Sequence, residues 1–387
     1  MGEWKWTTYI FFVTVSFVSV ILVRNAEKFA YINKADGTKK YKKMGKIYLA
    51  FTYLLLIFFC VIRNIEMYPP YIDGADIQTI DMKAYIYFFQ NGLTAGWDWK
   101  KILTFNQWEP LFYSLNLLIR AFTSNYRIYW FILYSFYIIC VLFFITHTFN
   151  YKMEYVVIPY FIVGLLYGMC ALRSCMANAI CLLAFYCLQK KKNIKFIFFV
   201  LVATLFHYTA ILVLPLVVVV SIGNNLRYLE REKCTCLLII GIVCIVIMIP
   251  IGRYIISLTK YSVYLGNRMT LMGQAPLVCC TLASLIFFND IKRKYKRLRI
   301  YVYMVFYNFL LMPFIVEFDI SRISDFFLFP RLLVWTMVVG CIRERCTDDN
   351  GKRIVSMGAF IIMMIWMLKI MYDMKAYGIM PYLCSWI

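Results

Sequence analysis

Charged side chains are scarce in this chain. They make up 16% of its 387 residues, whereas 63% of the residues are hydrophobic. A soluble domain has too little interior to bury that much apolar surface, so the composition excludes a protein built from soluble domains. No strong internal repeat and no low-complexity linker divides the sequence. We therefore expect one polytopic membrane domain over residues 1–387, an all-α transmembrane helix bundle of about 11–12 apolar segments.

Acidic residues are scarcer than basic ones. The chain carries 20 Asp and Glu against 41 Lys and Arg, which gives a formal net charge of +21. In a soluble protein such an excess would suggest a nucleic-acid partner. Here the positive charges concentrate in short segments between apolar runs, as in the cytoplasmic loops of membrane proteins. We therefore expect contacts with anionic membrane lipid and no nucleic-acid partner. Four such clusters lie at 24–46, 190–195, 290–299 and 343–353.

Histidine is almost absent, since the chain has only His147 and His207. The 14 cysteines lie mostly inside apolar runs, where cysteine behaves as a small hydrophobic residue. Cys234 and Cys236 form a close pair, but no second pair follows at the spacing of a zinc site. The sequence therefore predicts neither a metal site nor a cofactor.

The basic clusters set an expected topology. If 24–46 is cytoplasmic, the N-terminus and a large loop at 63–109 lie outside. The later clusters place 317–325 and the C-terminus outside as well. No small-residue cleavage site follows the apolar residues 7–23, so a cleavable signal peptide is not expected.

Two apolar stretches do not fit a single crossing. Residues 110–122 would add one crossing too many between the outer loop and the next basic segment. They are therefore expected to form a re-entrant or interfacial helix. Residues 196–220 carry His207 near their middle. We expect a break there, with two short passes at about 194–206 and 209–221 that place His207 at the outer face.

Arg173 is the only charged residue between Glu154 and Lys190. A charge within a membrane span costs about 2.5–3.5 kcal/mol on insertion scales, so such a residue has to face a partner or a water-filled cavity. The alternative is that 155–171 and 174–188 are two passes and that Arg173 lies in the turn between them. In either position Arg173 is a candidate for binding phosphate, because a guanidinium group donates two parallel hydrogen bonds to an oxyanion.

The outer loop 63–109 is rich in carboxylates and aromatic rings. Carboxylates accept hydrogen bonds from sugar hydroxyls, and aromatic rings pack on the apolar faces of a pyranose, so this composition favours a sugar ligand. The alternative is a solvated loop with an aromatic belt at the membrane surface. The acidic residues of the loop are Glu66, Asp73, Asp76, Asp81, Asp98 and Glu109.

Cationic side chains map to the same expected outer side. A lipid-linked pyrophosphate requires such cations, and a glycosyl transfer also requires a carboxylate that takes a proton from the acceptor hydroxyl. The position of His207 at a break between two short passes favours a functional role over a structural one. Arg253 and Arg268 have an alternative role as ordinary anchors at the membrane surface. The cationic set is Arg173, His207, Arg253, Arg268 and Arg322.

Several segments resemble the EpsG family, which is part of the wider Wzy-type polysaccharide and O-antigen polymerases. The likeness spans roughly 60–387 and is strongest at 169–216. There an Arg, a short Ala-rich helix and a basic turn precede an apolar run that ends in Phe-His before Pro-Leu. The other segments that carry the resemblance are Arg63 with YIDGAD at 71–76, EPLFYSLNLL at 109–118, Arg322 ahead of Phe326 and Phe327, and Pro381 with Tyr382.

Two positions depart from the family pattern. Ser174 stands where the family usually has Gln, which puts any role of that amide in doubt. The Gly-x-Asp of the family is usually followed at close spacing by a Tyr. Here Asp76 is followed by Asp81 and then by Tyr85, so either Asp76 or Asp81 is the counterpart.

The resemblance implies a glycosyltransferase that polymerises oligosaccharide repeat units carried on undecaprenyl pyrophosphate. It implies the outer side of the bacterial inner (cytoplasmic) membrane, no nucleotide sugar, and a flippase and a chain-length regulator as partners. In this hypothesis Arg173, His207 and Arg322 contact the pyrophosphate, and the carboxylates supply the base or bind sugar. The catalytic residues would be Asp76, Asp81, Glu109 and His207, and the substrate-binding residues Arg63, Asp73, Tyr85, Arg173 and Arg322.

Other functions compete with this hypothesis. A glycosyltransferase that adds a single sugar from a polyprenyl phosphate would also place acids in the first large outer loop, and product size separates the two. A transporter or flippase predicts inverted repeats and broken helices at mid-membrane, and no repeat is evident in the sequence. A membrane O-acyltransferase would change acylation without changing glycan length.

Overall fold

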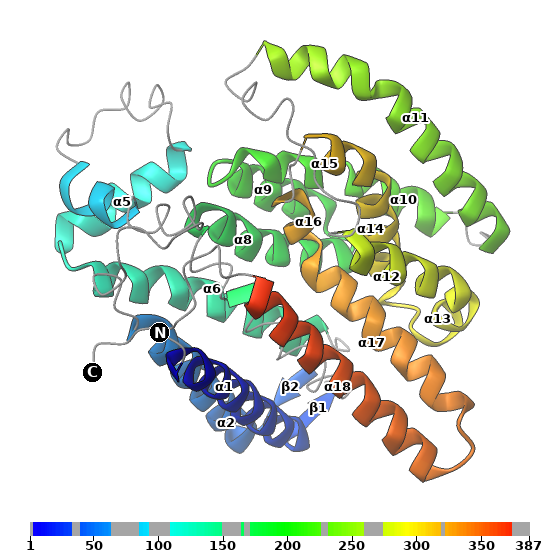
Figure 1. Cartoon of the computed structure of the whole chain (residues 1–387), viewed down its shortest axis with the longest axis horizontal. Helices are drawn as coiled ribbons and strands as arrows, with labels where there is room; N and C mark the ends of the chain where they lie inside the picture. The colour runs from blue at the N-terminus through cyan, green and yellow to red at the C-terminus, as the bar shows by residue number, and fades with distance from the viewer. Residues whose placement is uncertain are drawn as a thin grey trace. The chain divides into compact units, whose positions relative to one another are not determined.

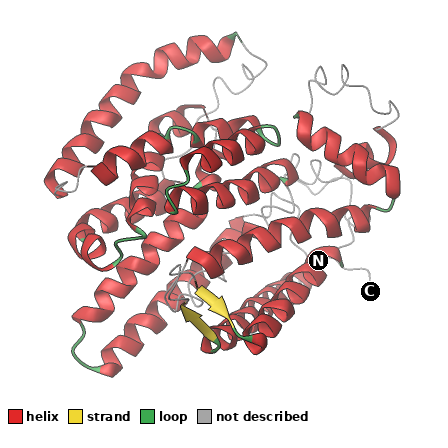
Figure 2. Cartoon of the chain, turned by 180° about the vertical axis from the view of Figure 1, so that it is seen from behind, coloured by secondary structure: helices red, strands yellow, loops and turns green. Residues whose placement is uncertain are grey.

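The computed structural model is almost entirely helical (Figure 1). Its one sheet in the described part is a small antiparallel hairpin, which Figure 2 shows in yellow. The fold class predicted from the sequence is therefore confirmed. The structure describes residues 3–32, 39–62, 85–92, 109–148, 164–165, 171–225, 231–258, 274–318 and 322–373.

The chain divides into two compact units. Unit 1 comprises Met1–Tyr186, Phe198–Tyr208 and Ala359–Ile387, and unit 2 comprises Cys187–Ile197 and Thr209–Gly358. Two such units can belong to one membrane domain, so the single domain expected over 1–387 stays a prediction.

In unit 1, three long helices pack side by side. Helix α1 (Glu3–Lys28) packs on α2 (Lys43–Val61), and α2 packs in turn on α6 (Tyr126–Thr148). The hairpin joins α1 to α2 and consists of β1 (Ala30–Ile32) and β2 (Lys39–Tyr41). The basic segment 24–46 did not predict this hairpin. An ion pair and a hydrogen bond from Lys39 and Tyr41 to Glu27 fasten it to the end of α1.

Unit 1 also contains shorter elements. They begin with η1 (Phe88–Gly92) and α5 (Pro110–Phe122). Helix α5 has 13 residues, a length of about 20 Å, which is too short to cross the ~30 Å hydrocarbon core alone. This length agrees with the expected re-entrant or interfacial helix. The elements that follow have residues in both units, and they are α8 (Leu172–Gln189), α9 (Asn193–Thr204) and η2 (Tyr208–Val213).

A tight basic turn joins α8 to α9. Lys191 has a φ of 57°, which lies in the left-handed region. The amide of Lys192 donates to the carbonyl of Cys187, and the amide of Lys191 donates to that of Leu188. This pair of bonds is the Schellman termination of a helix, whose left-handed position favours glycine. A lysine occupies that position here.

Helix α14 (Arg299–Leu310) forms the centre of unit 2, and most of its side chains are buried. It packs against α10 (Leu216–Asn225), α12 (Ala275–Ile286) and α17 (Leu328–Arg345). Gly223 on α10 lets the ring of Tyr303 approach its backbone, since a Cβ there would lie only 2.6 Å from that ring. Besides parts of α8, α9 and η2, the other helices with residues in unit 2 are α11 (Arg231–Ser257), α13 (Phe288–Lys294), α15 (Met312–Phe318), α16 (Arg322–Phe326) and α18 (Asp349–Asp373).

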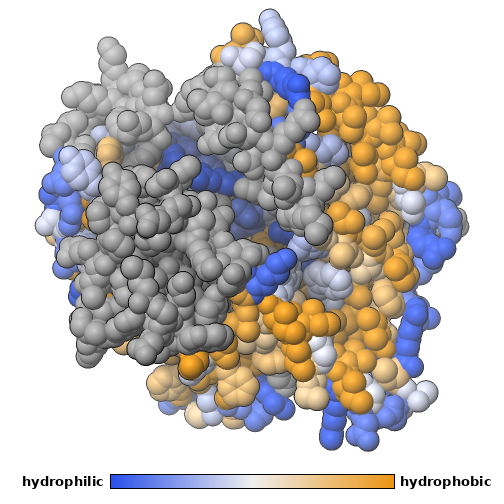
Figure 3. Space-filling view, in the orientation of Figure 1, coloured by the Kyte–Doolittle hydropathy of each residue, from blue (hydrophilic) through white to orange (hydrophobic). Residues whose placement is uncertain are grey.

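Several helices are long and apolar enough to cross a membrane. The described residues contain five of them, or up to seven if each of two bent pairs forms one span. The pairs are α12 with α13, bent by 71°, and α14 with α15, bent by 41°. The predicted 11–12 apolar segments also counted shorter or more charged stretches, such as 110–122 and 326–342. Hydrophobic residues cover much of the described surface on the right of Figure 3, as expected for a multi-pass membrane protein.

Candidate functional site

The first member of the site, Glu109, is held where α5 begins. Pro110 occupies the first position of α5, and the Glu109 backbone is extended. Its carboxylate does not cap the helix, so it can reach across to other segments. The amide of Leu111 donates to the carbonyl of Leu205 at 3.0 Å. This bond fixes the start of α5 beside the end of α9.

His207 lies in a break between two helical elements. Helix α9 ends at Thr204 and η2 begins at Tyr208, so the break predicted at His207 is present. Nδ1 of His207 lies 3.0 Å from Oε1 of Glu109. Because a carboxylate only accepts hydrogen bonds, this contact places a proton on Nδ1 of His207.

Arg173 is the second residue of α8 and lies at the N-terminal end of that helix. Its Nη1 donates to Oε2 of Glu109 at 2.9 Å. A cation is unfavourable at a helix N-terminus, where the macrodipole is positive, and the carboxylate compensates for it. The side chain of Arg173 is 21% exposed, whereas that of Glu109 is 3% exposed. The guanidinium is therefore the part of this pair that solvent or a ligand can reach.

Tyr85, just before η1, completes the cluster. Its hydroxyl accepts a hydrogen bond of 3.1 Å from Nε of Arg173. The Arg173 guanidinium also lies 6.0 Å from the centre of the Tyr85 ring. The ring packs edge-on against Phe112 of α5 at 5.8 Å. Phe112 was not among the predicted site residues, although its position three residues after Glu109 on a helix was a signal for it.

Burial and hydrogen bonding act on Glu109 in opposite directions. Burial raises the pKa of its carboxyl group, but the hydrogen bond from His207 and the charge of Arg173 outweigh burial and lower the pKa to about 2. Glu109 is therefore ionised at neutral pH and accepts a proton poorly there. In a neutral ring that carries its proton on Nδ1, Nε2 of His207 is the nitrogen that can accept a proton.

The structure brings together four of the nine predicted site residues: Tyr85, Glu109, Arg173 and His207. Arg322 begins α16 in unit 2 and is half-buried. Arg253 pairs with Glu317, also in unit 2. No group of three His, Cys, Asp or Glu side chains that could hold a metal occurs in the described part of the chain. The predicted residues that lie outside the described residues are Arg63, Asp73, Asp76, Asp81 and Arg268.

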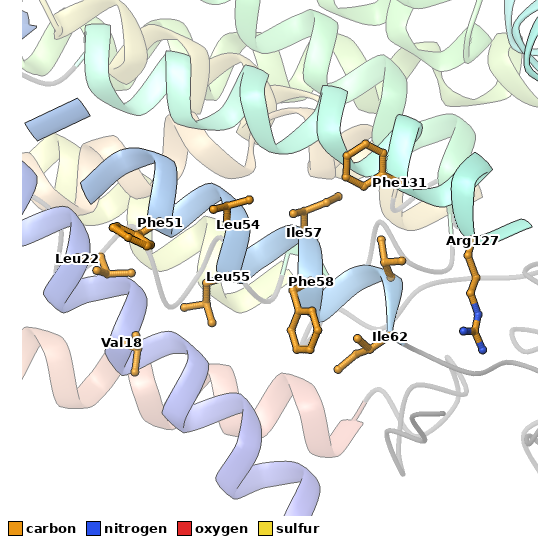
Figure 4. A pocket seen from close by; sticks show the side chains of 11 residues that line it. Val18, Leu22, Phe51, Leu54, Leu55, Ile57, Phe58, Ile62, Arg127 and Phe131 are labelled. Carbon is orange, nitrogen blue, oxygen red and sulfur yellow. The ribbon is translucent and has the colours of Figure 1, made fainter. Parts of the chain in front are cut away.

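Unit 1 also contains an apolar groove that the sequence did not predict. Its volume is about 840 Å³, and side chains of α1, α2 and α6 line it (Figure 4). Arg127, near the start of α6, is the single charged residue among the lining side chains. The lining residues lie far apart in the chain, and each of the three helices reads as an ordinary apolar span. Their sequence spacing therefore gave no signal of a shared groove.

Helix α6 connects this groove with the Glu109 cluster. Arg127 and Phe131 line the groove, and Tyr129 between them stacks on Phe89 of η1 at 4.2 Å. Phe89 lies four residues after Tyr85 in the same short segment. The Arg127 end of the groove and the cluster are thus linked through the first turns of α6.

Comparison with known proteins decides the family. The EpsG family model matches residues 74–384, which is most of the chain. The chain belongs to the EpsG family. No curated protein and no solved structure matches it. As an EpsG-family member it is a multi-pass membrane protein of polysaccharide biosynthesis, broadly a polymerase-like glycosyltransferase that acts on a lipid-linked substrate. The match includes all four residues of the cluster, whereas Arg63 and Asp73 precede it.

Proposed function

We propose that this EpsG-family protein joins oligosaccharide repeat units carried on undecaprenyl pyrophosphate at the outer face of the bacterial inner membrane. The observation that carries the proposal is the buried Glu109 carboxylate shared between His207 and Arg173. The imidazole and the guanidinium lie on opposite oxygens of one carboxylate. A displacement of a diphosphate by a hydroxyl requires both groups.

In the proposed reaction, a hydroxyl at the non-reducing end of one oligosaccharide attacks the anomeric carbon of another. Nε2 of His207 takes the hydroxyl proton as the new glycosidic C–O bond forms. The bond between the anomeric carbon and the lipid diphosphate breaks, and its electron pair leaves with the diphosphate oxygen. Arg173 stabilises that developing charge, and the proton passes from His207 to solvent or to the departing diphosphate.

Glu109 acts in this scheme as a positioning residue. With a pKa of about 2 it stays ionised, orients the His207 ring through Nδ1 and holds the Arg173 guanidinium. Tyr85 fixes the other edge of that guanidinium. Asp76 or Asp81 would bind the acceptor sugar.

The groove along α2 is suited to the polyprenyl chain of the substrate. Its lining is apolar apart from Arg127, whose cationic group lies at one end. An isoprenoid tail could lie along α1, α2 and α6 and leave its phosphates beside Arg127. The proposed partners also include a flippase that delivers the substrate and a regulator of chain length.

The test is the surface glycan of a deletion strain, separated by size. Complementation with the wild type should restore a ladder of polymer lengths, and complementation with Arg173→Ala should not. Arg343→Ala is a matched control, because Arg343 is an exposed arginine of α17. Normal polymer length with Arg173→Ala would refute the proposed role of the site. An unchanged ladder in the deletion strain, with one sugar missing from each unit, would indicate a single-sugar transferase, and an unchanged glycan would favour a transporter.

A reaction with purified components tests the chemistry directly. Protein in detergent, given a lipid-linked repeat unit as its only substrate, should release undecaprenyl pyrophosphate and form lipid-linked dimers and longer products. Product formation without any nucleotide sugar separates this activity from a nucleotide-dependent transferase. Hydrolysis to free oligosaccharide without chain growth would contradict the proposal.

A further inference from the structure

Unit 2 buries an arginine far along the chain from the Glu109 cluster. Arg331, in the first turns of α17, is 9% exposed. Its Nη2 donates to the backbone carbonyl of Ser324 at 3.2 Å. Nε has no acceptor, and no carboxylate pairs with the guanidinium, in the part of the chain that the structure describes. A buried charge without a compensating partner is strongly destabilising.

A second buried donor lies beside the same serine. Asn308 on α14 is fully buried, and its Oδ1 lies 3.4 Å from Oγ of Ser324. Its Nδ2 has no acceptor among the described residues. Oγ of Ser324 also approaches Oε1 of Gln274 at 3.4 Å, so α12, α14, α16 and α17 meet at this serine. The unpaired atoms of Arg331 and Asn308 are thus both N–H donors. A group that only accepts hydrogen bonds would satisfy them.

The helix ends add positive potential at the same place. Gln274 is the N-cap of α12, and Arg331 lies one turn inside the N-terminus of α17. Helix N-termini carry partial positive charge and unpaired amides, both of which favour an anion. Two helix N-termini, an arginine without a carboxylate and an amide donor without an acceptor therefore converge in one buried cluster.

We infer that Arg331 and Asn308 bind an oxyanion of the phosphate class within unit 2. The ligand is either a free phosphate or the phosphate of a lipid headgroup, since both present the same acceptor oxygens to a guanidinium fork. The site is formed entirely by residues of unit 2. It does not depend on the reaction proposed for the Glu109 cluster.

Thermal unfolding of the purified full-length protein in detergent tests this site. At constant ionic strength, the Tm of the wild type should rise saturably, by about 2–4 °C, when inorganic phosphate or pyrophosphate replaces chloride. In Arg331→Met the shift should disappear. In chloride alone this variant should have a Tm equal to or above that of the wild type, because a side chain of similar length replaces an uncompensated charge. Arg343→Met, an exposed arginine of the same helix, should keep the full shift.

A second arm distinguishes the two sources of phosphate. Protein in phosphatidylcholine nanodiscs is compared with protein in nanodiscs that also contain phosphatidic acid. A shift with inorganic phosphate supports a free anion, and a shift that appears only with phosphatidic acid supports a lipid headgroup. In both cases the shift has to depend on Arg331.

Other outcomes overturn the inference. One is a wild type whose Tm shifts with neither inorganic phosphate nor phosphatidic acid. Another is an Arg331→Met variant whose Tm shifts as much as that of the wild type. A third is a Tm of Arg331→Met in chloride several degrees below that of the wild type. The last result would make Arg331 a structural clamp on the Ser324 carbonyl. If Arg331→Met cannot be purified, Asn308→Leu tests the site instead. It should raise the phosphate concentration that gives half of the Tm shift about 10-fold.

Discussion

Glu109 uses both of its carboxylate oxygens. Oε1 orients His207 and Oε2 holds Arg173, so one buried side chain positions an imidazole and a guanidinium together. A charge-assisted hydrogen bond in a site of low polarity is stronger than the same contact in water, and removing one partner leaves the others uncompensated. The effects of substitutions within the cluster are therefore expected to be non-additive.

Replacing Glu109 by Gln tests whether the residues of the cluster act together. The amide has nearly the same shape, but it lacks the charge that pairs with Arg173 and fixes the proton on Nδ1 of His207. We expect the turnover number for polymerisation to fall about 100-fold or more, with a smaller change in KM. The measurement is the initial rate of product formation from a lipid-linked repeat unit.

Glu232→Gln is a matched control for this substitution, since Glu232 is an exposed carboxylate at the start of α11. Its rate should equal that of the wild type. A Glu109→Gln enzyme that retained full turnover would remove Glu109 from the proposed mechanism. A selective rise in KM would instead place it in substrate binding.

The low pKa of Glu109 also predicts a pH dependence of stability. Because folding lowers the pKa from 4.5 to about 2, the ionised carboxylate stabilises the fold above about pH 4.5. This contribution, about 3 kcal/mol at most, is lost as the pH falls through 2. The Tm difference between wild type and Glu109→Gln should shrink as the pH falls below 4.5. A difference that disappeared by pH 6 would contradict the assignment.

At the scale of single elements, the turn between α8 and α9 contains a residue whose replacement should stabilise the fold. Lys191 adopts a left-handed φ of 57°, which glycine adopts without steric penalty. Lys191→Gly should therefore raise the free energy of unfolding by about 1 kcal/mol, measured as an increase in Tm in detergent. Lys192→Gly, the next residue, should give no increase, because its backbone does not require the left-handed region.

The groove between α1, α2 and α6 predicts a dependence on lipid chain length. Leu54 lines the groove and is exposed, so Leu54→Trp should fill part of the space. We expect KM to rise about 10-fold for a substrate with a full undecaprenyl chain and to change little for a short-chain analogue. Leu237→Trp on the exposed surface of α11 is the matched control. An equal rise in KM for both substrates would show that the groove does not bind the lipid chain.

At the scale of the whole molecule, the sequence predicted single elements better than it predicted their contacts. Runs of apolar residues and basic clusters were enough for the fold class, the short helix at 110–122 and the break at His207. The 71° bend after α12 and the hairpin at 30–41 were not predicted, because each depends on packing rather than on local composition.

The candidate site was predicted as a set of residues and not as a geometry. Arg173 was identified as an isolated charge in an apolar stretch, and Glu109 was one of six acids in a loop. Nothing in their spacing of 64 residues indicated that Glu109, among those six, would be its partner. Arg331 was not identified, because a single arginine near the start of an apolar helix resembles an ordinary anchor.

The sequence separation of the cluster has a consequence for biogenesis. During synthesis Glu109 emerges long before Arg173, and His207 follows later still. A carboxylate without a cation is expensive to bury, so it is expected to remain in water until its partners arrive. Helix α5 carries Glu109 at its start and is too short to span alone. It should therefore wait at the membrane surface during translation and dock only when α8 has been inserted.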